Sequence, residues 1–258
     1  MTTRRLFITG TDTGVGKTHF TAWLARELQA AGLKLGAYKP ACSGAVQDSS
    51  SEPEASAPGD SKPTVPTWDD AERLAAALDQ SWPLERIAPQ CFIAPLAPPV
   101  AAALESREVD ERLLLASADW WDGRVDVLLI EGAGGWLSPV SHNWTNADLA
   151  SRLNASVVLV AGNRLGVINH ALLTIDAIAR TTGLLGVVLN ELSAPSRHAV
   201  PGFDPTQSNV GEIERRSGIR LWGTLSHGSA STLTCHGVPA ALDWNKLLML
   251  NSDRSQTI

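Results

Sequence analysis

The stretch GTDTGVGKT at residues 10–18 constrains the fold more than any other part of this sequence, because it directly follows the apolar run LFIT. A strand, a glycine-rich turn and a Lys-Thr pair that opens a helix together point backbone N–H groups into a phosphate-sized hollow. A strand-to-helix turn with a chance Gly-Lys-Thr is the alternative, but strand, glycines, lysine, hydroxyl and amphipathic helix all occur in the required order. We predict a phosphate loop in which Lys17 reaches the outer phosphates and the Thr18 hydroxyl ligates Mg²⁺.

The spacing of this loop departs from the usual phosphate-loop pattern. Gly10 and Gly16 enclose five residues, whereas the usual pattern has four residues between the two glycines. The extra residue argues against a generic nucleotidase and favours a particular group of phosphate-loop proteins.

Short apolar runs, each ended by a turn signal, recur along the chain with helical patterns between them. Because the runs are continuous rather than alternating, they suit strands covered on both faces, as in a parallel sheet. We predict strands in LFITG, KLGAYKP, VDVLLIEG, SVVLVAG, LLGVVLNEL and RLWGTL. Three predicted helices each place four apolar residues on one face: Phe20, Trp23, Leu24 and Leu28; Ala71, Leu74, Ala75 and Leu78; and Ile168, Leu172, Ile175 and Ala179.

Alternating strands and helices predict an α/β fold with a doubly wound, mostly parallel sheet flanked by helices, like that of the phosphate-loop NTPases. At 258 residues the chain is long enough for one large α/β domain or two small ones. We predict one nucleotide-binding domain over residues 1–258. Residues 45–67, rich in Ser, Pro and acidic residues, are predicted to be a mobile insertion loop because they have little to bury. A second long loop is expected at residues 193–208.

Composition limits the partners of this chain. A net charge of −6 gives no electrostatic reason to expect binding to nucleic acid or to an anionic membrane. The cysteines Cys42, Cys91 and Cys235 are widely spaced and form no CxxC pair, which favours a reduced compartment, and Cys42 is interpreted as a packing residue. The first apolar run is too short for a signal peptide or a membrane span, so we expect a cytoplasmic protein.

Five motifs together resemble the dethiobiotin synthetase family. They are GTDTGVGKT, YKPACSG at residues 38–44, EGAGGWLSPV at 131–140, RLGVINH at 164–170 and VVLNEL at 187–192, and they occur in the family's order. The resemblance implies an ATP- and magnesium-dependent cyclo-ligase that joins 7,8-diaminononanoate and CO₂ (or bicarbonate) into dethiobiotin. The reaction would pass through a carbamate and a carbamic-phosphoric anhydride.

Lys39 follows an apolar run and precedes Pro40, at the strand end where ligands of an open α/β sheet collect. A merely solvated lysine is the alternative at such a position. The resemblance implies that Lys39 steadies the carbamate and the transferring phosphoryl group, with Lys17 and Thr13 completing the catalytic set. It also implies that Ser43 hydrogen-bonds the substrate.

Glu131 ends an apolar run before GAGG, which suits a metal-binding carboxylate at the sheet edge, although an acidic turn cap is the alternative. The resemblance implies metal ligation by Glu131, by Thr18 and by an aspartate in TWDDAERL. Its Asp-Ala pair selects Asp70, but Asp69 is adjacent, and either aspartate could instead cap the helix.

The nucleotide site implied by the resemblance includes an asparagine, Asn190, that hydrogen-bonds adenine, although a turn-forming asparagine is the alternative. Ser226 stands where the family usually has a proline, which leaves the choice of nucleotide base open. The full predicted nucleotide-binding set is Asp12, Thr13, Gly14, Val15, Gly16, Lys17, Thr18, Glu131, Gly134 and Asn190.

The motif RLGVINH opens a predicted helix with a glycine, which leaves free N–H groups that suit a carboxylate, although a plain helix cap is the alternative. The resemblance implies a homodimer in which this helix start binds the substrate of the neighbouring subunit, through Leu165, Gly166, Val167 and Asn169. Two rival functions are a phosphate-loop partitioning or targeting ATPase and a glutamine-dependent amidating ligase. The first lacks its usual basic or membrane-binding surface here, and the C-terminal region is too short for the second.

Overall fold

The computed structural model describes residues 3–46, 66–192, 206, 208–228, 230–240, 242 and 244. Most of the predicted insertion at 45–67 and most of the predicted loop at 193–208 lie outside the described residues. The described ends of the insertion lie together, because Val46 and Thr67 form an antiparallel bridge in which the Val46 N–H donates to the Thr67 carbonyl at 2.8 Å.

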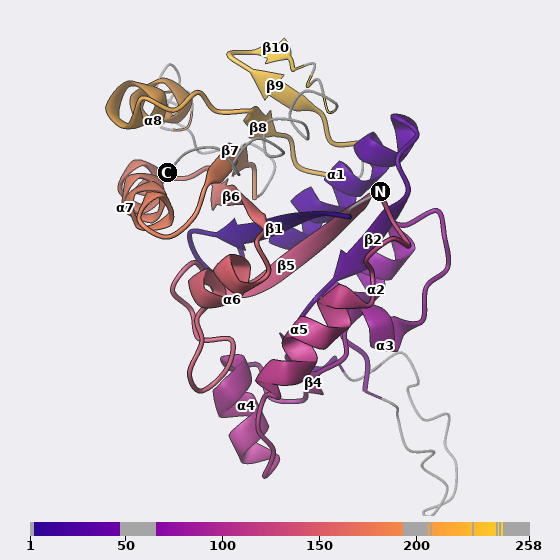
Figure 1. Ribbon diagram of the computed structural model, residues 1–258. Helices are drawn as coiled ribbons and strands as arrows, with labels where there is room; N and C mark the ends of the chain where they lie inside the picture. The colour runs from indigo at the N-terminus through magenta and orange to yellow at the C-terminus, as the bar shows by residue number, and fades with distance from the viewer. Residues whose placement is uncertain are drawn as a thin grey trace, which may run out of the picture.

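An eight-stranded sheet forms the centre of the described chain, in the order β10-β9-β8-β7-β6-β1-β5-β2 (Figure 1). Its parallel strands are β1 Arg4–Gly10, β2 Leu35–Tyr38, β5 Val127–Gly135, β6 Ser156–Gly162, β7 Leu184–Asn190 and β8 Gly223–Leu225. Each predicted apolar run overlaps one of these strands, so the mostly parallel α/β class is confirmed. An antiparallel hairpin, which the sequence did not predict, extends the sheet through β9 Leu233–Cys235 and β10 Val238–Pro239.

Helices cover both faces of this sheet, with α1 behind it and α6 in front of it in Figure 1. β6 is accordingly buried at all but its first residue and β5 from Val127 to Gly132, as expected for strands covered on both sides. The helices are α1 Lys17–Ala30, α2 Asp69–Ala76, α3 Leu84–Ile87, α4 Pro98–Leu104, α5 Glu111–Asp119, α6 Asn146–Arg152, α7 Val167–Ala179 and α8 Asn209–Ser217.

The predicted apolar face is right for α1 and only partly right for α7. In α1 the four predicted residues, from Phe20 to Leu28, are all buried. In α7 the buried residues are Val167, Ala171, Ile175 and Ile178, and the predicted Ala179 is exposed. The predicted face shares Ile175 with the buried one, and its Ile168 and Leu172 are only partly buried. Because α7 is apolar on most sides, the period alone did not identify the side that packs on the sheet.

A small second sheet lies apart from the large one. Two short parallel strands form it, β3 Cys42–Ser43 and β4 Cys91–Phe92. The backbone pairing continues past β3, because the N–H groups of Gly44 and Ala45 donate to the carbonyls of Ala94 and Ile93 at 3.1 and 2.9 Å. Segments on either side of the insertion are thereby held together.

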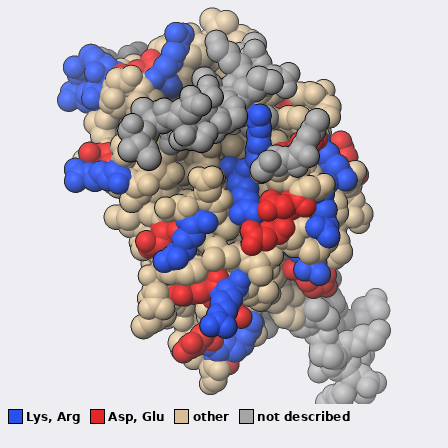
Figure 2. Space-filling model, viewed as in Figure 1, with Lys and Arg blue, Asp and Glu red and all other residues tan. Residues whose placement is uncertain are grey.

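Charged side chains of both signs are mixed on the face seen in Figure 2, with no large area of one sign. Exposed pairs of opposite charge one helical turn apart include Asp69–Arg73 and Asp176–Arg180. Among the helices of the described ranges, none is both long and apolar enough to cross a membrane.

Candidate active site

The phosphate loop connects the end of β1 to the start of α1 and turns on two glycines. Gly14 and Gly16 have φ of 72° and 83°, which other residues adopt only with strain. Gly16 is also the N-cap of α1, and a Cβ there would lie 1.8 Å from Nδ2 of Asn190. Position 16 therefore needs glycine for conformation and for space, and the first N–H groups of α1 face the loop without partners inside the helix.

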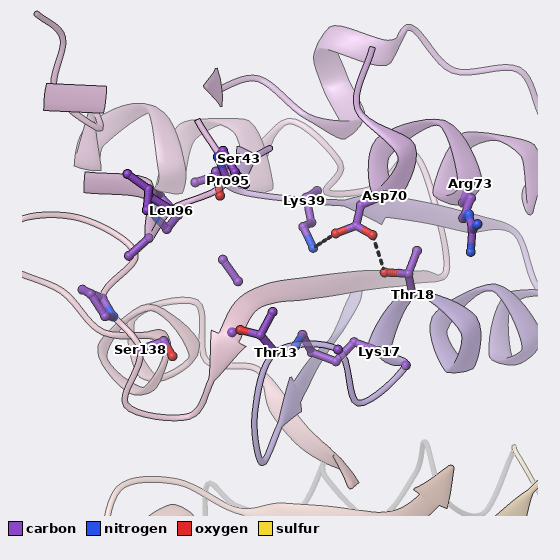
Figure 3. Close-up of a pocket in the computed structure, with 18 of the residues that line it drawn as sticks. Thr13, Lys17, Thr18, Lys39, Ser43, Asp70, Arg73, Pro95, Leu96 and Ser138 are labelled. Carbon is purple, nitrogen blue, oxygen red and sulfur yellow. Dashed lines mark hydrogen bonds and ion pairs between the residues drawn. The ribbon is translucent and has the colours of Figure 1, made fainter. Parts of the chain in front are cut away.

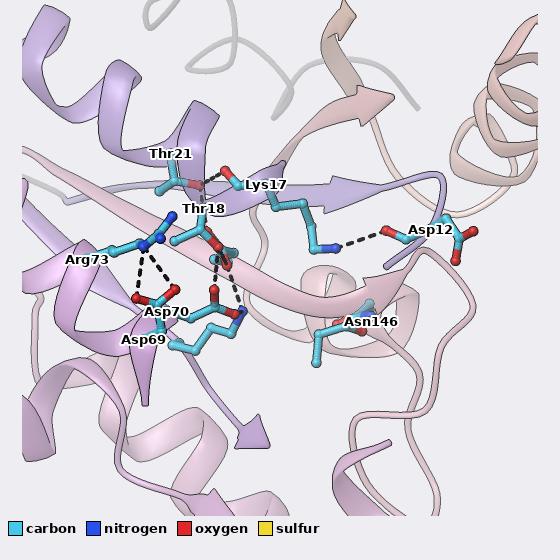
Figure 4. A network of polar contacts seen from close by, with 11 residues as sticks. Asp12, Lys17, Thr18, Thr21, Asp69, Asp70, Arg73 and Asn146 are labelled. Carbon is cyan, nitrogen blue, oxygen red and sulfur yellow. Dashed lines mark hydrogen bonds and ion pairs between the residues drawn. The ribbon is translucent and has the colours of Figure 1, made fainter. Parts of the chain in front are cut away.

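Lys17 is the first residue of α1, and only 7% of it is exposed. Its ammonium donates to the Asp12 carbonyl at 3.1 Å, so the side chain folds back over the loop (Figure 4). Burial, and then the charge of Lys39, lower the pKa of Lys17 from 10.5 to about 8. A buried ammonium beside a second cation suits the binding of an anion such as phosphate.

Four polar side chains from separate elements converge next to the loop (Figures 3 and 4). The ammonium of Lys39, which follows β2, lies 2.6 Å from Oε1 of Glu131 in β5 and 2.7 Å from Oδ2 of Asp70 in α2. The hydroxyl of Thr18 in α1 lies 2.8 Å from Oδ1 of Asp70 and 2.9 Å from Oε1 of Glu131. We call Thr18, Lys39, Asp70 and Glu131 the carboxylate cluster.

The charges of this cluster stabilise one another inside the protein. Although burial disfavours its ammonium, Glu131 and Asp70 raise the pKa of Lys39 well above its usual range. Burial likewise disfavours the Asp70 carboxylate, but the charge of Lys39 and hydrogen bonds from Lys39 and Thr18 hold the pKa of Asp70 below its usual value. Glu131 is fully buried and Lys39 is 4% exposed, so this ion pair is shielded from water.

The structure separates the two adjacent aspartates that the sequence left as alternatives. Asp70 faces Thr18 and Lys39, whereas Asp69 pairs with Arg73 on the exposed side of α2, at 2.9 Å (Figure 4). Neither side chain makes a capping hydrogen bond at the start of α2. Only Asp70 therefore lies where it could share a metal ion with Thr18.

The cluster fits the predicted Mg²⁺ ion. Thr18, Asp70 and Glu131 offer hard oxygen donors, and the Thr18 hydroxyl lies within 2.9 Å of both carboxylates. Within the described ranges no group of three or more His, Cys, Asp and Glu residues is assembled for a metal. Two carboxylates and a hydroxyl suit Mg²⁺ beside a polyphosphate, because this ion usually keeps water and phosphate oxygens as its other ligands.

The sequence analysis did not identify two buried polar residues that hold the site in place. Thr21 is fully buried one turn after Lys17, and its hydroxyl donates to Oε2 of Glu131 at 2.9 Å. Asn146, also fully buried, donates through Nδ2 to the Ala133 and Gly135 carbonyls at 2.7 Å and so fixes the glycine-rich end of β5. Thr21 could have been found as a polar residue next to the apolar face of α1, but Asn146 gave no comparable signal.

A cavity of about 700 Å³ opens between the phosphate loop and the segment after β4 (Figure 3). Pro95, Leu96 and Ser138, none of them predicted, form part of its wall, which combines apolar surface with one hydroxyl. The predicted residues that line the cavity are Thr13, Gly14, Gly16, Lys17, Thr18, Lys39, Ser43, Asp70 and Gly134. Lys17 and Lys39 thus open onto one cavity.

Asn190, the last residue of β7, packs against the phosphate loop. Its Nδ2 donates to the Val15 carbonyl at 3.1 Å, and its buried Oδ1 has no hydrogen-bond partner among the described residues. Because an unpartnered buried acceptor is costly, this oxygen suits a donor such as the amine of adenine. Ser226 follows β8, and its hydroxyl accepts from the Thr232 N–H at 2.9 Å. The predicted roles of both residues in base recognition stay predictions.

The predicted residues at the start of α7 do not line this cavity, as far as the described chain shows. Leu165 is 85% exposed, Asn169 is exposed, and Gly166 is the N-cap with φ 95°. The Val167 side chain is buried in the core of its own chain. Any contact with a partner subunit would therefore involve the Leu165 and Asn169 side chains and the backbone of the helix start.

The strand–loop–helix unit and the mostly parallel sheet define a phosphate-loop protein of the nucleoside-triphosphate-binding class. A family model described as an AAA domain matches residues 4–232, and the chain belongs to that family. Within it, the chain belongs to the family of ATP-dependent dethiobiotin synthetases, because curated relatives of that name match it over most of its length.

These relatives cover nearly the same span as this chain. The ATP-dependent dethiobiotin synthetase BioD of Anaeromyxobacter sp. (strain Fw109-5) is 42% identical over 87% of this chain and 90% of its own length. The proteins of the same name from Phenylobacterium zucineum and Rhodopirellula baltica are 38% and 35% identical, over 88% and 90% of this chain and 91% and 87% of their own lengths. A signal recognition particle receptor FtsY from Elizabethkingia anophelis, in complex with GDP, shares 16% identity over 91% of this chain and 61% of its own, with a TM-score of 0.49.

Proposed function

We propose that this protein closes the ureido ring of dethiobiotin from 7,8-diaminononanoate and CO₂ at the expense of ATP. Membership of the dethiobiotin synthetase family supports the reaction. The observation that carries the proposal for this site is the single cavity shared by Lys17 and Lys39, because the reaction requires a phosphate and a carbamate to meet. Two separate cavities would have been incompatible with it.

The reaction asks little covalent chemistry of the protein. One amine of the diamine takes up CO₂ as a carbamate, and the carbamate oxygen attacks the γ-phosphorus of ATP while ADP leaves. The second amine then attacks the carbonyl carbon of the carbamic-phosphoric anhydride and releases phosphate. The protein must align these groups, stabilise the shifting negative charge and exclude water. No nucleophilic side chain is needed.

The residues of the cavity divide these tasks. Lys17 and the loop backbone hold the outer phosphates, with Thr13 beside them, while Lys39 stabilises the charge shared by carbamate and phosphoryl group. Ser43 orients the diamine, and the apolar surface of Pro95 and Leu96 limits access of water to the anhydride. Magnesium, when held by Thr18, Asp70 and Glu131, would supply further positive charge at the outer phosphates.

The same proposal includes one ATP-binding domain and a cytoplasmic homodimer. Its interface would use the start of α7, where Leu165 exposes a large apolar side chain. A long, exposed ion pair of 3.8 Å between Arg164 and Asp12 places this helix start beside the phosphate loop of the same chain. A substrate carboxylate at the partner's helix start would thus lie near the cavity that contains the reacting groups.

The direct test is to incubate the protein with 7,8-diaminononanoate, bicarbonate, ATP and magnesium and to detect dethiobiotin by mass. We expect product only when all four are present, with one phosphate released for each ring closed. Phosphate release that does not depend on the diamine would contradict the proposal and favour an ATPase switch.

A further inference from the structure

Two cysteines far apart in the sequence lie directly opposite each other in the small sheet. Cys42 of β3 and Cys91 of β4 are Cα partners in a parallel pair. Neighbouring strands lie about 4.8 Å apart, and disulfides join cysteines whose Cα atoms are about 4.4–6.8 Å apart. Because paired residues of adjacent strands project to the same face, the backbone places both thiols for bond formation.

The environments of the two thiols differ in a way that suits stepwise oxidation. Cys42 is 2% exposed, whereas Cys91 is only partly buried. The adjacent Cys91 thiol, together with burial, raises the pKa of Cys42, and the adjacent Cys42 thiol lowers the pKa of Cys91. The Cys91 thiol itself donates to the Ala88 carbonyl at 3.4 Å. Arg107, whose guanidinium donates to the Cys91 carbonyl at 3.1 Å, adds positive charge nearby. The accessible sulfur is therefore the more reactive one, and the buried sulfur is held beside it.

We propose that Cys42 and Cys91 form a redox-active dithiol that closes reversibly to a disulfide when the protein meets a peroxide. The Cys91 sulfur attacks one oxygen of the peroxide and the O–O bond breaks. That oxygen stays on the sulfur as a sulfenic acid, and the other oxygen leaves with the thiol proton as water. The Cys42 sulfur then attacks the Cys91 sulfur, the S–O bond breaks, and a second water leaves with the thiol proton. An external dithiol reverses the bond.

The consequence for catalysis rests on the proposed function. Cys42 immediately precedes Ser43, and the chain after Cys91 supplies Pro95 and Leu96, so both strands lead into the cavity wall. A disulfide would impose new side-chain torsion angles on both cysteines and so shift the adjoining cavity wall relative to the two lysines. Since small misplacements of reacting groups cost up to about a hundredfold in rate, we expect oxidation to lower kcat/KM for the diamine by about tenfold or more.

The test for the bond itself uses the intact protein and needs no activity. The reduced protein is treated with hydrogen peroxide, quenched, and mapped by mass spectrometry without reduction. We expect the three free thiols to fall to one, with a peptide linking Cys42 to Cys91 that disappears after dithiothreitol. Absence of that linked peptide, or linkage of either cysteine to Cys235 instead, would overturn the proposal.

Matched variants test the effect on turnover. Cys235→Ser keeps the dithiol and should lose activity on oxidation and regain it on reduction, as the unmodified protein does. Cys91→Ser cannot close the bond, so its own activity before and after mild peroxide should be equal. Equal inactivation of both variants by peroxide would overturn the proposal that the Cys42–Cys91 disulfide lowers activity. A reduced protein that makes no dethiobiotin would contradict the proposed function but not the mapped disulfide.

Discussion

The phosphate loop and the carboxylate cluster each hold a buried lysine, but they hold it in opposite ways. The ammonium of Lys17 donates to a backbone carbonyl at 3.1 Å, whereas that of Lys39 lies 2.6 and 2.7 Å from two carboxylate oxygens. The pKa of Lys17 is lowered to about 8, while that of Lys39 is raised. One cavity thus combines a positive charge that an incoming anion would neutralise with another that the protein has already neutralised.

Two lysines of one site therefore need not contribute equally to the stability of the protein. A buried lysine without a carboxylate partner lowers the stability of the folded protein, so removing its charge costs nothing. Removing a paired lysine leaves its carboxylate partner buried without a counter-charge, which destabilises the protein. Substitutions at the two positions should therefore separate stability from activity.

The largest effect is expected for Lys39→Met. Removal of the ammonium leaves Glu131 fully buried beside Asp70 without its cation, which should lower the free energy of unfolding by about 3–5 kcal/mol, as well as remove activity. Urea unfolding at pH 7 measures the loss. The double variant Lys39→Met with Glu131→Gln should recover much of the stability but not the activity, and no recovery would contradict this explanation.

Lys17→Met should show the other half of the comparison. Its stability should equal or slightly exceed that of the unmodified protein, because a partly desolvated charge is lost. The rate of dethiobiotin formation should fall about 100- to 1000-fold, because a preorganised charge at the transferring phosphoryl group is missing. Equal destabilisation by the two methionine substitutions would remove the distinction between the lysines.

A smaller effect is expected at the two adjacent aspartates of α2. Asp70→Asn should raise the magnesium concentration needed for half-maximal activity about 10- to 100-fold, because one predicted ligand and its contact with Thr18 are altered. Asp69→Asn is the matched control: it breaks only an exposed pair with Arg73, so stability should change by less than about 0.5 kcal/mol and the magnesium requirement should not change. A larger magnesium effect at Asp69 would reverse the assignment.

These aspartates also mark the limit of what local sequence patterns predict about the site. The loop, the six strands and the face of α1 follow from local order and period, and the structure agrees with them. Asp70 was selected through the resemblance to a family. Helical period alone could not choose it over Asp69, because packing of α2 against α1 decides which of the two neighbours meets Thr18.

Contacts between segments that are distant in the sequence could not be predicted from local patterns. The pairing of Cys42 with Cys91 depends on a two-residue strand pair, which has no period to detect. The wall formed by Pro95 and Leu96 likewise comes from a segment that is apolar without a regular pattern. The buried face of α7 failed for a related reason, since a helix that is apolar on several sides needs its neighbours to select one.

The smallest effect tests the lowered pKa of Lys17. The folded protein releases the Lys17 proton near pH 8, and the unfolded chain releases it near pH 10.5. Between these values the unfolded state binds more protons, so this group makes the free energy of unfolding rise with pH. Anion binding has the opposite dependence, because it needs the ammonium. The affinity for ATP without added divalent cation should therefore fall by up to about tenfold per pH unit above pH 8.

Titration calorimetry from pH 8 to 10 measures this dependence in a range where the phosphates of ATP are fully ionised. Lys17→Met serves as the control: it should bind ATP more weakly, and its affinity should stay flat over that range, because the titrating group is gone. Lys39 should contribute no slope there, since its carboxylate partners keep the ammonium charged. A slope that survives in Lys17→Met would assign the proton to another group and would leave the two lysines alike in their response to pH.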